Sequence, residues 1–205
     1  EILFEDIKLF AQESLKNDLK FQLNSILKKN APTVKFDIAK IFYKIFFHSE
    51  SIDSIDLNGT SSSVKLDLNL PHDLGKQFDC VINLGTAEHI FNVHQVFSSI
   101  HKWVKKNGIV IHELPMYGDV DHGFYCFHPT FFWDLVFANK YHNILIGKST
   151  WKQTIIYRSR ESCSKEIMSQ DKDKVYYIWS IYKKVYNEEF KIPRQAVYDD
   201  NLKNN

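Results

Sequence analysis

The chain has 205 residues, of which 44% are hydrophobic and 15% aromatic, so it can bury one sizeable core. Its 26 basic and 25 acidic residues give a net charge of +1, which leaves no electrostatic footprint for nucleic acid. No apolar run reaches the roughly 18 to 20 residues of a membrane span. Three widely spaced cysteines suit a reducing compartment. We therefore expect a cytoplasmic protein with no membrane span and no nucleic-acid partner.

The N-terminal region carries a helical pattern. Apolar residues recur at helical spacing through residues 1–29, with lysines between them. Asn30-Ala31-Pro32 ends this pattern, and residues 36–47 predict a second, buried helix. We expect residues 1–35 to be an N-terminal helical segment, residues 36–194 an α/β domain and residues 195–205 a tail. The first helix either packs on that domain or contacts a partner or a second copy of the chain.

The stretch 78–92 is central to the predicted sheet. A β-branched strand at 78–84 breaks at Gly85 and becomes a helix near Ala87. Two short strands that end in or near aspartate precede it, and alternating strands and helices follow. The other predicted elements are strands at 52–55, 64–68, 109–114, 143–146 and 175–182, and helices at 93–104, capped by the cations and glycine of 105–108, and at 129–139.

Two motifs carry a resemblance to a known family. The segment GTAEHIFN at 85–92, followed by HGFYCFHP at 122–129, resembles a subgroup of the class I S-adenosylmethionine (SAM)-dependent methyltransferases. The resemblance covers residues 36 to about 185. It implies an α/β, Rossmann-like fold with a mostly parallel twisted sheet, an antiparallel last strand and helices on both faces. It also implies SAM as cofactor and O-methylation of a small-molecule substrate, a hydroxylated acceptor such as a sugar.

The resemblance assigns the ribose and adenine contacts to residues near the ends of the second and third strands. Asp56, beside Leu57, would accept hydrogen bonds from the ribose hydroxyls, because a carboxylate can take two donors at once. Asp67 would accept from the adenine amino group, and Leu68 would pack on the ring. The alternative for both aspartates is a local cap at the end of a strand. We expect Asp56 and Gly85 to lie around one cleft, where open α/β sheets bind ligands.

The loop after the central strand would contact the methionine part and the transferred methyl group. Gly85 allows close backbone approach, and Glu88 with His89 resembles the family's Glu-His pair. A carboxylate in a first helical turn is also favoured by the helix dipole, so Glu88 has a structural alternative. The residues assigned to this part of the cofactor are Asn83, Gly85, Thr86 and Glu88.

His122 is the leading candidate for a general base, and His89 is the second catalytic candidate. An alcohol acceptor must lose its proton as the methyl group arrives, and imidazole suits that role near neutral pH. The alternative for His122 is a turn cap. The aromatic residues around it favour a core role, namely Phe124, Tyr125, Phe127, Phe131, Phe132 and Trp133.

Two further features bear on function. No pair of histidines has a tight ligand spacing, since His89 and His94 are five residues apart, so we predict no metal site. The family's glycine-rich cofactor turn is also missing, because none of the seven glycines precedes Gly59. The second hypothesis is therefore a catalytically degenerate methyltransferase-like module that acts in binding or assembly, and we expect weak SAM binding.

Overall fold

The computed structural model describes residues 34–47, 51–59, 63–150, 152–168 and 174–198, with the shorter pieces 17, 21–22, 24–26, 28, 49 and 61. Most of the expected helix at 1–29 lies outside these residues. The chain divides into two compact units, Glu1–Asp67 and Leu68–Asn205, which we describe separately. Among the described helices, none is both long enough and apolar enough to cross a membrane.

The described residues of the smaller unit include one complete helix and one β-bridge. Helix α3 (Val34–Phe47) confirms the helix expected at 36–47, and Ile41 is buried in it. The two strands expected at 52–55 and 64–68 are wrong, because the described residues there form only one isolated parallel bridge, Ile55 to Val64. A short pair of strands without a third neighbour is only marginally stable, which explains why no ladder extends from this bridge.

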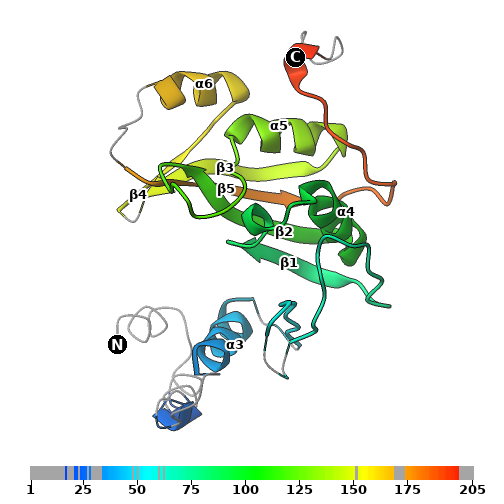
Figure 1. The fold of residues 1–205 in the computed structure, drawn as a ribbon, viewed down its shortest axis with the longest axis vertical. Helices are drawn as coiled ribbons and strands as arrows, with labels where there is room; N and C mark the ends of the chain where they lie inside the picture. Colours follow the sequence, from blue (N-terminus) through cyan, green and yellow to red (C-terminus); the bar gives the residue numbers. More distant parts are fainter. Residues whose placement is uncertain are drawn as a thin grey trace. The chain divides into compact units, whose positions relative to one another are not determined.

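The larger unit is built on a five-stranded sheet in the order β1-β2-β5-β3-β4 (Figure 1). Only β1 and β2 are parallel, and every other neighbouring pair is antiparallel. The last strand among the described residues, β5, therefore lies between two earlier ones. The strands are β1 (Phe78–Leu84), β2 (Val104–Tyr117), β3 (His142–Thr150), β4 (Gln153–Ile156) and β5 (Tyr176–Lys183).

The Rossmann-like fold class expected from the resemblance is wrong. The sheet is mixed rather than mostly parallel, and burial alternates strictly along β5, where Ile178 is buried and Trp179 is only partly buried. Such alternation is typical of a sheet with one well-covered face. Helices α4 (Val93–Trp103) and α5 (Pro129–Ala138) both contact His112 on that buried face, through Phe97 and Phe132. The described helices therefore do not cover both faces of the sheet.

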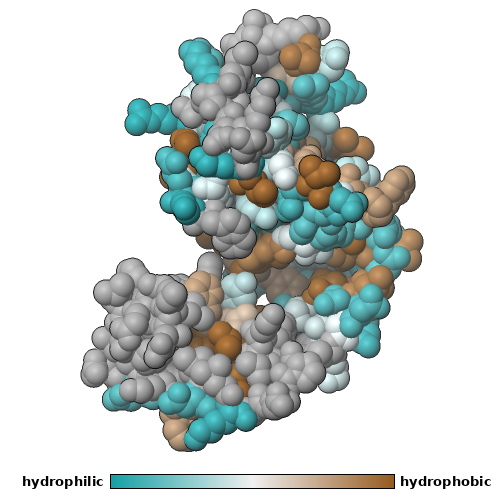
Figure 2. All heavy atoms as spheres, turned by 60° about the vertical axis from the view of Figure 1, so that its left-hand side comes forward, coloured by the Kyte–Doolittle hydropathy of each residue, from teal (hydrophilic) through white to brown (hydrophobic). Residues whose placement is uncertain are grey.

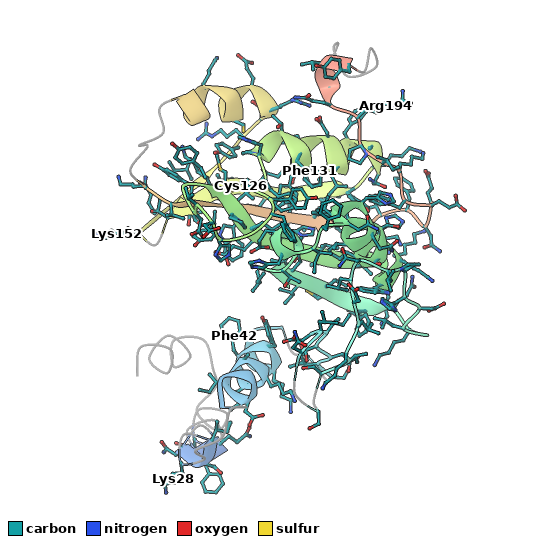
Figure 3. All side chains as sticks on the ribbon, in the orientation of Figure 1. Lys28, Phe42, Cys126, Phe131, Lys152 and Arg194 are labelled. Atoms are coloured by element: carbon teal, nitrogen blue, oxygen red, sulfur yellow. The ribbon has the colours of Figure 1, made fainter. Side chains whose placement is uncertain are left out.

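An aromatic core fills the space between these helices and the sheet, where Phe131 lies (Figure 3). The core role predicted for the aromatic residues is confirmed for Phe127 and Phe132, which are buried. Tyr125, Phe131 and Trp133 are partly buried and pack against this core. Phe124 is the exception, since 66% of it is exposed.

The junction between α4 and β2 differs from the predicted cap. Helix α4 ends at Trp103 and β2 begins at once, so residues 105–108 belong to the strand. Asn107 has a positive φ of 67° and the register with β1 shifts here, which absorbs the change of direction. The buried Lys184 ammonium takes the capping role and donates to the carbonyls of His101 (2.8 Å) and Val104 (3.3 Å). Burial lowers the pKa of Lys184.

Two elements of the larger unit were not predicted. Strand β4 extends the sheet, and helix α6 (Arg160–Met168) packs against α5. Arg160 at the start of α6 forms a bidentate ion pair with the buried Asp134 of α5. Asp134 also accepts from the backbone N–H of Ala196, which opens a short 3-10 turn, η2 (Ala196–Tyr198). On the face shown in Figure 2, apolar residues stand among polar ones over the described surface.

Candidate functional site

Two loops meet at the carboxyl end of the parallel strand pair. β1 ends at Leu84, beside Glu113 of β2, and the Gly85 N–H donates to the Glu113 carbonyl (3.0 Å). The second loop follows β2 and includes residues 118–128. The Phe124 N–H donates to the carbonyl of Glu88 (2.7 Å), so the backbone joins the two loops. Parallel strands deliver both loops to the same edge of the sheet, where side chains 34 residues apart can converge.

A buried hydrogen-bond chain fixes the start of the first loop. The Asn83 side-chain oxygen accepts from the backbone N–H of Ala87 (3.3 Å), so its amide nitrogen donates to Nδ1 of His112 (3.0 Å). Nδ1 is then the acceptor, and Nε2–H of His112 donates to the Tyr182 hydroxyl (3.2 Å). Burial lowers the pKa of His112 to about 3, which keeps the ring neutral. This series of hydrogen bonds holds the short 3-10 helix η1 (Ala87–His89) against the sheet.

Glu88 is a buried carboxylate without a hydrogen-bond donor. Its side chain has no exposed surface, and neither carboxylate oxygen accepts a hydrogen bond. Its nearest polar neighbours are Nε2 of His122, 3.5 Å from Oε1, and Nε2 of His89, 3.6 Å from Oε1. Within the described part of the chain, no lysine or arginine pairs with Glu88. An ionised carboxylate in this setting is costly to bury unless a cation or a donor reaches it.

His122 lies between two carboxylates. Its Nε2 faces Glu88, and its Nδ1 is 3.5 Å from Oδ2 of Asp119. The Tyr177 hydroxyl of β5 donates to the same Asp119 oxygen (3.2 Å), which fixes that carboxylate. The rings of His89 and His122 are 4.9 Å apart between centroids, and both side chains are partly exposed, by 45% and 39%. The four side chains Glu88, His89, Asp119 and His122, hereafter the Glu88 cluster, therefore share one edge of the sheet.

The electrostatic field around this cluster is negative. Burial raises the pKa of Glu113, and the Glu88 charge raises it further. The pKa of the Cys126 thiol is raised by burial and then by Asp119 and Glu88. The pKa of Tyr177 is raised by burial, by its hydrogen bond to Asp119 and by the nearby carboxylates. Three groups from separate elements thus respond to the same uncompensated acidic charge, which attracts cations.

The glycine of the HGFYCFHP motif permits this arrangement. A Cβ at Gly123 would lie 3.0 Å from both Cγ and the carbonyl oxygen of Glu88, and 3.2 Å from Nδ1 of His89. Any larger residue would push the two side chains apart. Gly85 has a positive φ of 62°, which favours glycine at the turn out of β1.

The remaining predicted residues of the larger unit lie near this edge or support it. Both ends of the Asn83 amide have partners within the chain, as described above. The Thr86 hydroxyl donates weakly to the carbonyl of Leu84 (3.4 Å), and Gly85 is exposed. Leu68 is partly buried and packs against the core of this unit.

Three of the four residues predicted to bind ribose and adenine belong to the smaller unit, whereas Leu68 belongs to the larger one. Oδ1 of Asp56 accepts from the backbone N–H of Asn58 (2.9 Å), so part of this carboxylate caps its own turn. Leu57 is 58% exposed, and Asp67 is partly buried. The cleft expected to join Asp56 with Gly85 stays a prediction.

Sequence reasoning missed two residues of the site. Asp119 stands three residues before His122, and this spacing within one loop is a signal that could have identified it. Tyr177 is 58 residues from Asp119 and reaches it only because β5 pairs with β2, which no local pattern indicates. A polar depression between residues 71–73 and α4 is lined by other residues and is separate from the Glu88 cluster.

Two exposed aromatic rings flank the cluster. Phe91 and Phe124 are 73% and 66% exposed, and their rings meet edge to face with centroids 6.2 Å apart. The Tyr125 hydroxyl donates to the Phe91 carbonyl (2.8 Å) and fixes this loop. Exposed aromatic faces beside polar groups are typical of binding surfaces.

No protein-family model matches this chain, and a search of the curated proteins finds no significant match. Its function is therefore argued from the cluster itself.

Proposed function

We propose that this chain is a SAM-dependent methyltransferase that methylates an oxygen of a small hydroxylated acceptor such as a sugar. The observation that carries the proposal is the position of His122. Its ring is partly exposed, lies at the carboxyl end of parallel strands and has a carboxylate facing each nitrogen. This is the arrangement of an oriented proton acceptor.

The chemistry requires alignment and one proton transfer. As the acceptor oxygen takes the methyl group, its proton passes to Nε2 of His122. Asp119 holds the other nitrogen and stabilises the imidazolium that forms, and Tyr177 keeps Asp119 in place. His89 offers a second ring nitrogen to an acceptor hydroxyl. The exposed faces of Phe91 and Phe124 supply an apolar surface for the acceptor ring.

The residues fit the methionine end of SAM. The buried Glu88 carboxylate lacks a donor and suits the ammonium group of that end, and the turn at Gly85 allows close backbone approach. SAM would supply the methyl group, carried on its sulfonium. The sequence provides no glycine-rich turn with backbone donors for the carboxylate end, so we expect binding to be weak.

That missing turn favours a second candidate function, a methyltransferase-like module without catalysis. None of the seven glycines stands before Gly59, where the family's cofactor turn belongs. Such a module would bind a partner rather than transfer a methyl group. The binding of SAM separates the two candidates.

The test is calorimetry with SAM on the 205-residue chain, followed by a methyl-transfer assay on a panel of sugars. We expect a dissociation constant above about 10 μM. On any acceptor that is methylated, His122→Asn should lower turnover by roughly 10²- to 10⁴-fold while SAM affinity barely changes. Equal turnover in His122→Asn would refute the role of His122. No SAM binding at millimolar concentration would favour the non-catalytic module.

A further inference from the structure

We propose that Glu88, His89 and His122 bind a divalent transition-metal ion. Each of the three offers one ligand atom, and these atoms lie within 4.8 Å of one another. Spacing in the sequence does not indicate this site, because two ligands follow β1 and the third follows β2. The parallel pairing of these strands brings them together.

Two of the three distances between the proposed ligand atoms fit ligands around a shared ion. Two ligands at about 2.1 Å from a metal in tetrahedral geometry are roughly 3.4 Å apart. Oε1 of Glu88 is 3.5 Å from Nε2 of His122 and 3.6 Å from Nε2 of His89. These separations are long for direct hydrogen bonds. They are close to the distance expected between two atoms that bind the same metal ion.

The burial of Glu88 is an independent observation that points to a cation. Its carboxylate is fully buried, and neither oxygen accepts a hydrogen bond. One divalent ion at the cluster would compensate the buried charge.

The surroundings of His122 match the outer shell of a metal site. A metal-bound histidine commonly directs its other ring nitrogen at a carboxylate, which fixes the tautomer and the ring orientation. Nδ1 of His122 faces Asp119 at 3.5 Å, and Asp119 is held by the Tyr177 hydroxyl. With Nδ1 protonated, Nε2 presents its lone pair toward Glu88 and His89.

The donor set selects the class of metal. Two imidazole nitrogens and one carboxylate oxygen suit Zn²⁺, Fe²⁺ or Co²⁺, whereas Mg²⁺ and Ca²⁺ require mostly oxygen ligands. Three protein ligands leave a coordination position open, as in catalytic rather than structural zinc sites.

Metal binding does not depend on the proposed methyl transfer, but it would regulate it. Nε2 of His122 is both a ligand here and the proton acceptor proposed above. A bound ion occupies that lone pair, so the loaded site cannot use His122 as a base. This consequence rests on the proposed function, whereas the binding itself is measured without SAM or acceptor.

The test uses the full chain, treated with a chelator and desalted. Titration with Zn²⁺ by calorimetry should give one site with a dissociation constant at or below about 10 μM. Mg²⁺ and Ca²⁺ should give no heat at the same concentrations. Co²⁺ serves as a second probe, because its visible absorption reports the ligands around it.

Substitutions of the proposed ligands test which residues bind the ion. Glu88→Gln, His89→Asn and His122→Asn should each raise the dissociation constant above about 1 mM and remove the Co²⁺ spectrum. Asp119→Asn keeps all three ligands and should weaken binding roughly 10- to 100-fold. His142→Asn, an exposed histidine at the start of β3, is the matched control and should bind like the parent chain. Circular dichroism confirms that each variant is folded.

Two results would overturn the proposal. The first is no Zn²⁺ or Co²⁺ binding by the folded parent chain. The second is binding that persists unchanged in folded Glu88→Gln and His122→Asn, which would place the ion elsewhere. A chain that binds Zn²⁺ as described but, in its metal-free form, neither binds SAM nor methylates an acceptor would refute the proposed function and leave the metal site intact.

Discussion

The buried ring of His112 makes the stability of the larger unit depend on pH. Burial lowers the pKa of His112 from 6.5 to about 3, and its side chain is fully buried. Between about pH 6.5 and pH 3, His112 is protonated in the unfolded chain and neutral in the folded chain. The unfolded state therefore binds more protons in this window, so stability falls as the pH falls. The slope is about 1.4 kcal/mol per pH unit, or roughly 4–5 kcal/mol over the whole window.

The assay is urea unfolding followed by tryptophan fluorescence between about pH 7 and pH 5. All four tryptophans lie after residue 100, so the signal reports on the larger unit. His112→Gln can keep an acceptor toward Asn83 and a donor toward Tyr182 while it removes the titrating ring. At pH 7 it should cost about 1–3 kcal/mol, because the fit is imperfect. As the pH falls, the difference in free energy of unfolding between the parent and His112→Gln should shrink by about 1.4 kcal/mol per pH unit.

The control is Tyr182→Phe, which removes a hydrogen-bond partner of His112 but leaves the ring buried. It should lose about 1 kcal/mol at every pH and keep the parent slope. The reasoning is refuted if His112→Gln has the same slope as the parent chain between about pH 6.5 and pH 5.

Three other substitutions test particular contacts. Gly123→Ala retains all three ligand residues but puts a Cβ 3.0 Å from Cγ of Glu88, which displaces that side chain, so calorimetry should show Zn²⁺ binding weakened roughly 10-fold or more. Arg160→Met removes the ion-pair partner of the buried Asp134 and should lower the free energy of urea unfolding by about 2–3 kcal/mol. An unchanged midpoint would show that water replaces the guanidinium. Lys184→Met leaves two carbonyls at the end of α4 without a donor and should cost about 1–2 kcal/mol in the same assay, whereas a gain would mean that burying the ammonium outweighs its hydrogen bonds.

Local patterns predicted individual elements well. The β-branched run at 78–84 forms β1 with the expected limits, and α4 and α5 begin where predicted. The arrangement of the strands was beyond such patterns, because pairing and direction depend on contacts between distant segments. In β5 the aromatic and aliphatic residues occupy both faces, so hydrophobicity alone hides the alternation in burial that the structure shows.

The candidate site, too, could be predicted only in part from the sequence. Glu88 and His89 stand in one motif, and their place in the turn after a strand made them candidates for a site. His122 was recognised as a candidate, but its approach to Glu88 depends on the parallel pairing of β1 and β2. Sequence spacing gave no reason to group these three as metal ligands. Tyr177 could not be identified at all without the position of β5.

The central position of β5 has a consequence for biosynthesis. Chains fold as they emerge from the ribosome, and β2 and β3 are made long before residues 176–183. Until then β2 and β3 each present an unpaired edge that can recruit another chain. The β5 residue that pairs with Ile109 is Lys183, which lies 74 positions downstream. The larger unit therefore completes its sheet only after Lys183 has been made, and a product that terminates before Tyr176 should aggregate and depend on chaperones to stay in solution.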